Sequence, residues 1–185
     1  MVRVLGIDPG SRLAGYACVE VERLPVLQMK QCRVIDAGVL KVDSKVPFGE
    51  RIGHLHDALH VLTCDLQPDV GVFEDAFCHK NFRSALKLAQ ARGALLTAVT
   101  REGKAVAELS PTAVKKSIVG SGHATKEQVA LTLEACLGFR RGVRPFDVTD
   151  ALAIAVTYAM TIRPLGDTHG FHFQGSTTQR SHLRV

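Results

Sequence analysis

The sequence predicts a mixed α/β domain in which one sheet carries helices on its faces. Residues 2–8, 13–22 and 30–42 are rich in Val, Ile and Cys and are joined by short turns, which is typical of consecutive strands. Two further apolar segments, 69–75 and 104–109, alternate with segments of helical periodicity. A run of strands followed by alternating strands and helices indicates a mixed sheet of five strands.

The helices are predicted from apolar residues that recur at helical spacing. The first helix is expected to stop at Pro68, and its apolar stripe consists of Ile52, Leu55, Leu59, Leu62 and Leu66. The remaining helices are predicted over residues 84–100, 111–119, 126–138 and 147–162, and Pro164 ends the last of them.

The length and composition favour one domain with a tail. The 185 residues suffice to bury a core, and no apolar run approaches the roughly 18 residues that a membrane span needs. We expect the domain over residues 1–163 and a polar, disordered tail over residues 164–185. We expect no signal peptide, because no basic region precedes an apolar segment at the start. Five cysteines at irregular spacings, without a CxxC pair, indicate reduced thiols and a cytoplasmic protein.

Two acidic side chains end strands that are otherwise apolar. Asp8 shares a strand face with Val4, and Glu74 shares one with Val72. A strand that is apolar on both faces is usually buried on both, so each acid is expected at the mouth of the core. Alternatively, Asp8 only accepts hydrogen bonds from the turn at residues 9–11.

Two more acids, Asp147 and Asp150, open the last predicted helix on one face, about a turn apart. Helix capping offers a structural explanation. Asp147 would be the N-cap, and the negative charge of Asp150 would interact favourably with the helix dipole. Capping does not explain why four acids, which include Asp8 and Glu74, lie at the edges of apolar elements. Buried carboxylates repel one another, so we expect divalent cations with oxygen ligands to hold them, and Mg²⁺ is the natural choice.

The formal net charge of the chain is +5. With four acids in a metal site, the remaining surface is more basic still, which favours a polyanionic partner such as a nucleic acid. Two divalent ions about 3.5–4 Å apart can activate a water and stabilise the leaving oxygen of a phosphodiester.

Five sequence blocks resemble the RuvC-type Holliday-junction resolvases, in the order GIDPGSRLAGYA, VFEDAF, SALKLAQARG, VKKSIVGSGHATKEQV and DVTDALAIA, over roughly residues 2–160. The resemblance implies a ribonuclease-H-like fold and a homodimer that makes paired symmetric nicks in four-way DNA junctions, in homologous recombination and DNA repair. It also implies a branch-migration helicase complex as a partner.

Matched position by position, the resemblance makes Asp8, Glu74, Asp147 and Asp150 the catalytic metal ligands, with two Mg²⁺ ions per subunit and Mn²⁺ as an alternative. One ion would activate the attacking water, and the other would stabilise the departing 3′ oxygen and leave a 5′ phosphate. Asp75 departs from the family pattern, and its role is left open, since it should point to the opposite strand face.

Other residues match positions that contact DNA in the family. Phe77 matches an aromatic that stacks on an unpaired base at the junction centre, although it could instead be a core residue, and Phe82 competes with it. Lys115 and Lys126 match phosphate-contacting positions. The same basic track is extended by Lys116, Lys80 and Arg83, each of which alone could be a solvated charge.

The second predicted helix carries small residues, Ala85, Ala89 and Gly93, at every fourth position. This flat strip could pack against the sheet of its own chain. Because a junction has approximate two-fold symmetry, we place the helix 84–100 instead at a homodimer interface.

The first predicted helix carries His56, His60 and Cys64 at spacings of four. This spacing could bind zinc, or the three side chains could simply line the border of the leucine stripe.

Two rival functions stay open at the level of sequence. GIDPGS also resembles the phosphate-binding hairpin of actin-like sugar kinases and chaperone ATPases, but that fold needs a second lobe for which 185 residues leave little room. The other rival is a non-catalytic module that binds branched DNA. The four acids argue against it, because negative charge facing phosphate weakens binding.

Overall fold

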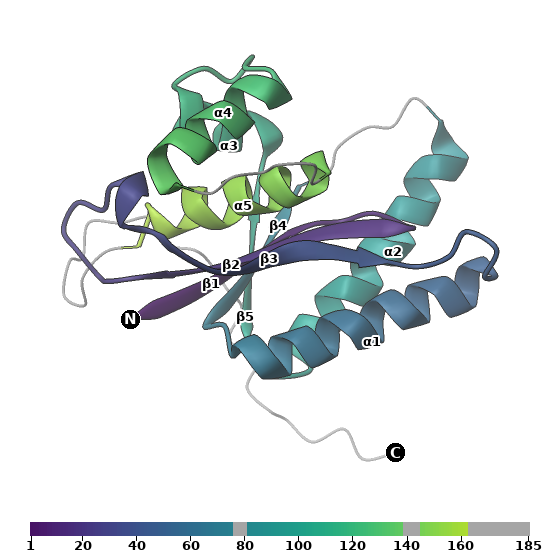
Figure 1. Cartoon of the computed structure of the whole chain (residues 1–185). Coiled ribbons are helices and arrows are strands. Elements are labelled where there is room, and N and C mark those ends of the chain that lie inside the picture. The colour runs from purple at the N-terminus through teal and green to yellow at the C-terminus, as the bar shows by residue number, and fades with distance from the viewer. Residues whose placement is uncertain (76–80, 139–144, 163–185) are drawn as a thin grey trace.

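The computed structural model describes residues 1–75, 81–138 and 145–162, which form one five-stranded sheet with helices on both faces (Figure 1). The strands are β1 (Val2–Asp8), β2 (Leu13–Val21), β3 (Arg33–Lys41), β4 (Val70–Glu74) and β5 (Ala105–Leu109). The helices are α1 (Phe48–Leu66), α2 (Phe82–Thr100), α3 (Pro111–Val119), α4 (Lys126–Leu137) and α5 (Phe146–Ala159), with a 3-10 helix η1 (Met29–Gln31) before β3.

The strand order is β3-β2-β1-β4-β5. β1 and β3 both pair antiparallel with β2, whereas β1, β4 and β5 run parallel to one another. The predicted mixed five-stranded sheet is therefore confirmed. The parallel pairing places the carboxyl ends of β1 and β4 at the same edge, and each of these strands ends in an acid.

Two element boundaries differ from the prediction by three residues, and the others differ by less. The third strand was expected from residue 30 but begins at Arg33, because η1 occupies the preceding residues and the side chain of Gln31 accepts a 2.7 Å hydrogen bond from the N–H of Gln28. The last helix begins at Phe146 and ends at Ala159 rather than spanning residues 147–162. The predicted tail, residues 164–185, lies outside the described residues.

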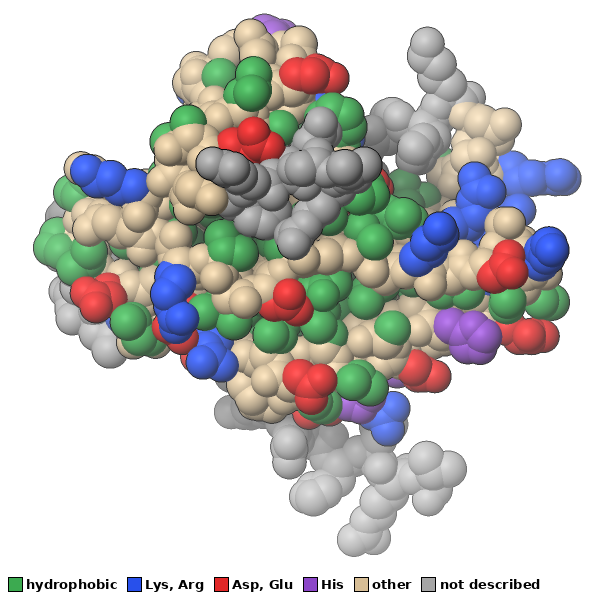
Figure 2. Space-filling model, in the orientation of Figure 1, with side chains coloured by type: hydrophobic (Ala, Val, Ile, Leu, Met, Phe, Trp, Pro, Cys, Tyr) green, Lys and Arg blue, Asp and Glu red, His purple; other side chains and the backbone are tan. Residues whose placement is uncertain are grey.

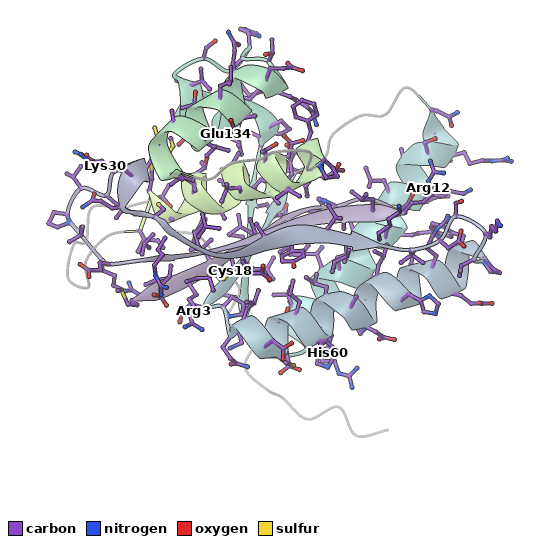
Figure 3. The ribbon with its side chains drawn as sticks, viewed as in Figure 1. Arg3, Arg12, Cys18, Lys30, His60 and Glu134 are labelled. Carbon is purple, nitrogen blue, oxygen red and sulfur yellow. The ribbon has the colours of Figure 1, made fainter. Side chains whose placement is uncertain are left out.

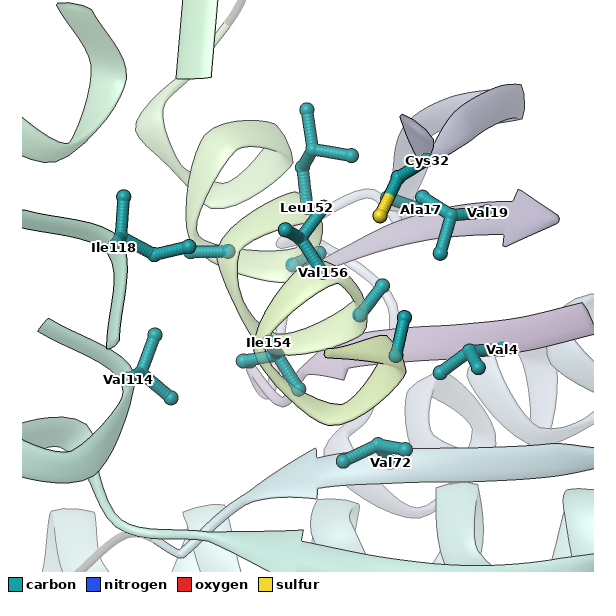
Figure 4. Packing of buried hydrophobic residues seen from close by; sticks show 14 of the residues in the cluster. Val4, Ala17, Val19, Cys32, Val72, Val114, Ile118, Leu152, Ile154 and Val156 are labelled. Carbon is teal, nitrogen blue, oxygen red and sulfur yellow. The ribbon is translucent and has the colours of Figure 1, made fainter. Parts of the chain in front are cut away.

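The two faces of the sheet bury separate hydrophobic clusters. Val4 and Val72 pack against α5 (Figure 4), whereas Leu5, Ile7 and Phe73 pack against α1 and α2 on the opposite face. Every one of these side chains is buried. The period-two pattern of the sequence predicted this separation, and it places the acids that end β1 and β4 on the α5 face.

Helix α5 is apolar around most of its circumference apart from the acids of its first two turns, and most of its 14 residues are buried. A helix of this kind must be covered on all sides. The sheet covers one side, and α3 and α4 pack on the other (Figure 1). None of the helices among the described residues has both the length and the apolar composition needed to span a membrane.

Two glycines let the backbone of α5 contact the sheet directly. A Cβ atom at Gly6 would lie 2.2 Å from the carbonyl oxygen of Ala151, and one at Gly15 would lie 2.0 Å from the carbonyl oxygen of Asp147. Real Cβ atoms essentially never approach another heavy atom within 3.0 Å. Any larger residue at either position would push α5 away from β1 and β2.

We therefore expect Gly6→Ala to lower the free energy of unfolding by about 2–4 kcal/mol, because the added methyl group must displace the backbone of α5. Gly53→Ala is the matched control, because no atom lies within 4 Å of a Cβ built at this position on α1. The control should leave stability unchanged or raise it by up to about 1 kcal/mol. Urea unfolding of both variants measures the difference, and equal stability would contradict the close packing.

Candidate active site

Asp8 and Glu74 end neighbouring parallel strands on the same face of the sheet. In the ladder between β1 and β4, Gly6 pairs with Val72 and Ile7 with Phe73, so the next residue of each strand is an acid. Both acids are partly buried, in line with the expectation that they stand at the mouth of the core.

Helix α5 brings Asp147 and Asp150 to the same place. Asp8 pairs with Gly15 across β1 and β2, and Gly15 is the residue on which the backbone of Asp147 packs. The capping interpretation of Asp147 is wrong, because Pro145 is the N-cap and Asp147 lies within the first turn. Together Asp8, Glu74, Asp147 and Asp150 are termed the acid cluster below.

The acids of the cluster interact through their charges. Burial raises the pKa of Asp8 from its ordinary value of 3.8 to about 8, the charges of Asp150 and Glu74 raise it as well, and Asp147 adds less. Lys126 opposes this rise. Burial and then Asp150 also raise the pKa of Glu74. Like charges that destabilise one another in this way need a cation, which is what the sequence predicts at this position.

Two lysines line the acid cluster. The ammonium of Lys126 donates to Asp150, whose side chain is 16% exposed. Although burial lowers the pKa of Lys126, the hydrogen bond and charge of Asp150 outweigh this and raise it. Lys115 and Lys126, together with Glu74 and Asp150, line a cavity of about 210 Å³ between α3, α4 and α5. Lys126 therefore supplies positive charge at the site.

The donor set suits hard divalent cations. The acid cluster offers only carboxylate oxygens, and Mg²⁺ prefers such oxygens with one or two carboxylates per ion and waters completing the shell. In the part of the chain that the structure describes, no three of the four acids have carboxylate oxygens that all lie within 4.8 Å of one another. Four carboxylates carry the negative charge that two divalent ions would neutralise.

The chain matches the family model described as crossover junction endodeoxyribonuclease RuvC over residues 4–158. The chain belongs to the RuvC family. The RuvC of Halorhodospira halophila is 40% identical over 159 residues, which are 86% of this chain and 90% of that protein. The RuvC of Sulfurovum sp. is 38% identical over 162 residues, which are 88% of this chain and 98% of that protein.

Solved structures agree with this family. Thermus thermophilus RuvC in complex with Holliday junction substrate superposes with a TM-score of 0.78 at 33% identity, covering 86% of this chain and 94% of that one. The yeast mitochondrial Holliday junction resolvase Ydc2 shares the fold, with a TM-score of 0.59 at 16% identity over 85% of this chain and 77% of that one.

Membership of the RuvC family confirms the predicted resemblance, the ribonuclease-H-like fold and the enzyme class, an endodeoxyribonuclease of a metal-dependent family. It does not favour the two alternatives, a non-catalytic DNA-binding module and a fragment of an actin-like ATPase or kinase.

The predicted DNA-binding residues of this RuvC-family chain fall into three groups. Lys115 and Lys126 line the acid cluster. Lys116 is exposed on α3, and Arg83 is exposed at the start of α2, where Lys and Arg side chains gather at one end of the molecule (Figure 2). Phe77 and Lys80 lie outside the described residues. Phe82, the alternative to Phe77 as the stacking residue, is 82% exposed, so it is not a core residue.

Sequence reasoning missed two arginines beside the site. Arg92 on α2 pairs with Glu108 on β5 at 2.6 Å, and its Nε donates to the carbonyl oxygen of Glu74 at 3.5 Å. Arg12 is exposed in the turn after Asp8, toward the same end of the molecule as the start of α2 (Figure 3). The signal for Arg92 was its position within the more apolar second half of α2, and the signal for Arg12 was its proximity to Asp8 in the sequence.

The raised pKa of Asp8 predicts how the stability of the metal-free protein depends on pH. Between about pH 4 and pH 8 the native state keeps a proton that the unfolded chain has released, so the free energy of unfolding falls as pH rises through this window. Asp8→Asn cannot ionise and should therefore be more stable than the unmodified chain at pH 8 by about 1–3 kcal/mol, with a smaller gain at pH 5.

Urea unfolding in EDTA at both pH values measures this difference. Asp65→Asn, which makes the same chemical change at an exposed acid of α1, should not alter the pH dependence. Excess Mg²⁺ should reduce the advantage of Asp8→Asn, because it stabilises the ionised cluster. A pH dependence that is the same with and without Asp8 would contradict the assignment of a buried, proton-retaining Asp8.

Proposed function

We propose that this chain resolves four-way DNA junctions by paired symmetric nicks, through two-metal-ion hydrolysis of a phosphodiester bond in each of two strands. The observation that carries the proposal is the convergence of the acid cluster from β1, β4 and α5 on one partly buried site. Family membership and the likeness to Thermus thermophilus RuvC, solved in complex with Holliday junction substrate, support it.

We assign the acid cluster as the catalytic metal ligands for two Mg²⁺ ions per subunit, with Mn²⁺ as an alternative. When bound, such ions neutralise the carboxylates, activate a water for attack and stabilise the leaving oxygen of the phosphodiester. The chain itself contributes the fixed positions of the acids. Arg92 pairs with Glu108 and donates to the carbonyl oxygen of Glu74, and these contacts hold the end of β4 and thus Glu74 beside Asp8.

Lys126 and Lys115 position the DNA backbone in this proposal. Both stand beside the acid cluster, where a point charge attracts phosphate without reading base sequence. The ammonium of Lys126 donates to Asp150, so this lysine would lie beside a phosphate held at the acid cluster. Exposed Lys116, Arg83 and Arg12 would continue a basic track along the junction arms. We keep Phe77 as the stacking residue and Lys80 as a further contact.

A homodimer would place one acid cluster on each of two strands. The outer face of α2 supports this arrangement. Phe82 and Leu86 are exposed there, together with Ala89, and a Cβ at Gly93 would meet no atom within 4 Å. The alternative, that this strip packs against the sheet of its own chain, is wrong, because the sheet side of α2 is formed by Ala91, Leu95, Ala98 and Val99.

We assign the nuclease domain to residues 1–163, with 164–185 as a tail, and place the enzyme in the cytoplasm, acting in homologous recombination and DNA repair. Free thiols at the four described cysteines, two of them buried, suit a reducing compartment. A branch-migration helicase complex is the expected partner.

The test of the proposed function is cleavage of a synthetic four-way junction. The unmodified chain should make paired nicks with Mg²⁺ and none in EDTA. Asp8→Asn should cut roughly 10³-fold more slowly or not at all, because it removes a metal ligand, yet bind the junction as tightly or more tightly. Asp57→Asn, at an acid of α1 whose side chain is 78% exposed, is the matched control and should cut normally.

Normal cutting by Asp8→Asn would show that the site is assigned wrongly. Junction binding without nicks in either condition would favour the non-catalytic module, and ATP turnover without DNA cleavage would favour the kinase-like fold.

Ala89→Glu should weaken self-association by tenfold or more, or about 1.4 kcal/mol, because it buries a charge in the proposed interface. The control is Val61→Glu, which places the same charge on α1 at a side chain that is 59% exposed. Sedimentation equilibrium of both variants gives the dissociation constants. A dimer that survives Ala89→Glu and dissociates with Val61→Glu would move the interface to α1.

A further inference from the structure

Three side chains of metal-ligating type meet on the face of the sheet that α1 and α2 cover. His60 and Cys64 lie one turn apart on α1, where Figure 3 labels His60, and Glu102 follows the end of α2. One ligand atom of each lies within 4.8 Å of the other two. All three side chains are partly buried, so an ion could reach them from solvent.

The distances between the ligand atoms fit a tetrahedral ion. Cys64 Sγ lies 3.7 Å from His60 Nδ1, and His60 Nδ1 lies 3.4 Å from Glu102 Oε1. Zinc bonds of about 2.3 Å to sulfur and about 2.0–2.1 Å to nitrogen or oxygen, at a tetrahedral angle, place these atom pairs about 3.6 and 3.3 Å apart. Little movement of the side chains is therefore needed to receive an ion.

The backbone that carries the three ligands is held by packing. On α1, Leu59 and Thr63 are fully buried beside the two ligands, and on α2 Ala98 and Val99 are buried just before the turn that carries Glu102. α1 and α2 also pack extensively on one another. The ligand positions are thus set by the core.

We propose that His60, Cys64 and Glu102 bind one zinc ion, with water as the fourth ligand, and that this ion joins the end of α1 to the turn after α2. Thiolate and imidazole ligands select zinc over magnesium. Because Cys64 binds the metal as a thiolate, its thiol proton passes to solvent when the sulfur–metal bond forms.

The site differs from the helical triplet that the sequence suggested. His56 was the third member of that triplet, but its Nδ1 contacts Asp57 Oδ1 at 2.9 Å, and its ring centroid lies 6.2 Å from that of His60. Glu102 completes the group instead, from 38 residues further along the chain than Cys64. No local spacing could indicate this partner.

The other charged groups near the thiol agree with a site that binds a cation. Burial, then the charge of Glu102 and then that of Asp65 raise the pKa of Cys64. Lys104 also faces Cys64 and opposes this rise, and its ammonium donates to Gln67 at 3.0 Å. When a metal displaces the thiol proton, Cys64 and Glu102 each supply a negatively charged ligand.

The site is separate from the acid cluster in place and in chemistry. Glu74 stands at the carboxyl end of β4, whereas α2 runs back along the sheet and reaches Glu102 near the opposite end of the strands (Figure 1). The acid cluster offers oxygen ligands alone. A test of the zinc site therefore does not depend on nuclease activity.

Titration of the full-length, metal-free protein with Co²⁺ tests the proposal, because a cobalt–thiolate bond gives a near-ultraviolet charge-transfer absorption that carboxylates do not give. One equivalent should produce the band, and Zn²⁺ should remove it. Cys64→Ser should abolish it, and His60→Ala and Glu102→Gln should each weaken Co²⁺ affinity by about tenfold or more. Circular dichroism checks that each variant is folded.

The control variants are Cys78→Ser and Cys136→Ser, which remove two other cysteines, and Asp8→Asn, which alters the acid cluster. All three should keep the band. Absence of the band in the unmodified chain, or its persistence in Cys64→Ser, would overturn the zinc site. So would an unchanged Co²⁺ affinity in both His60→Ala and Glu102→Gln.

Discussion

The repulsion between carboxylates at the end of an apolar core is the constraint on which the rest of this structure depends. Burial and, after it, the charges of Asp150 and Glu74 raise the pKa of Asp8, so the ionised form of this acid is unfavourable in the fold. A protein tolerates such an arrangement when the surrounding core is firm and a cation can enter. Here the core beneath the acids is built from β1, β4 and α5, and these are the elements that carry the acids themselves.

The contact between α5 and the sheet both stabilises the core and fixes the positions of the acids. Gly6 and Gly15 let the helix backbone touch β1 and β2, and the same contact sets the distance between Asp147 and Asp8. α5 is buried on every side, so it cannot move outward to relieve the repulsion. Lys126 offsets part of the charge from the opposite wall, where it pairs with Asp150. The same contacts of α5 therefore determine both the packing of the core and the positions of the charged groups of the site.

Local periodicity explains how much of this could be predicted from the sequence. The alternation along each strand was enough to place Asp8 on the face of Val4 and Glu74 on the face of Val72, and the spacing of three was enough to align Asp147 with Asp150. The N-cap was misassigned because Pro145, without a capping side chain, begins the helix two residues earlier than the acid pattern suggested. Contacts between residues that are distant in the sequence, such as that of Glu102 with His60 and Cys64, have no local sequence pattern from which they could be predicted.

Those contacts across the fold keep two sets of potential metal ligands apart. The sheet separates a pocket of carboxylates at the carboxyl ends of β1 and β4 from a mixed nitrogen, sulfur and oxygen cluster on the opposite face. Hard cations favour the first ligand set, and softer transition metals favour the second. A thiolate beside the carboxylates would favour softer transition metals at the site that we propose for Mg²⁺. By keeping Cys64 on the far side of the sheet, the fold lets one chain hold both kinds of ligand without their competing for the same ion.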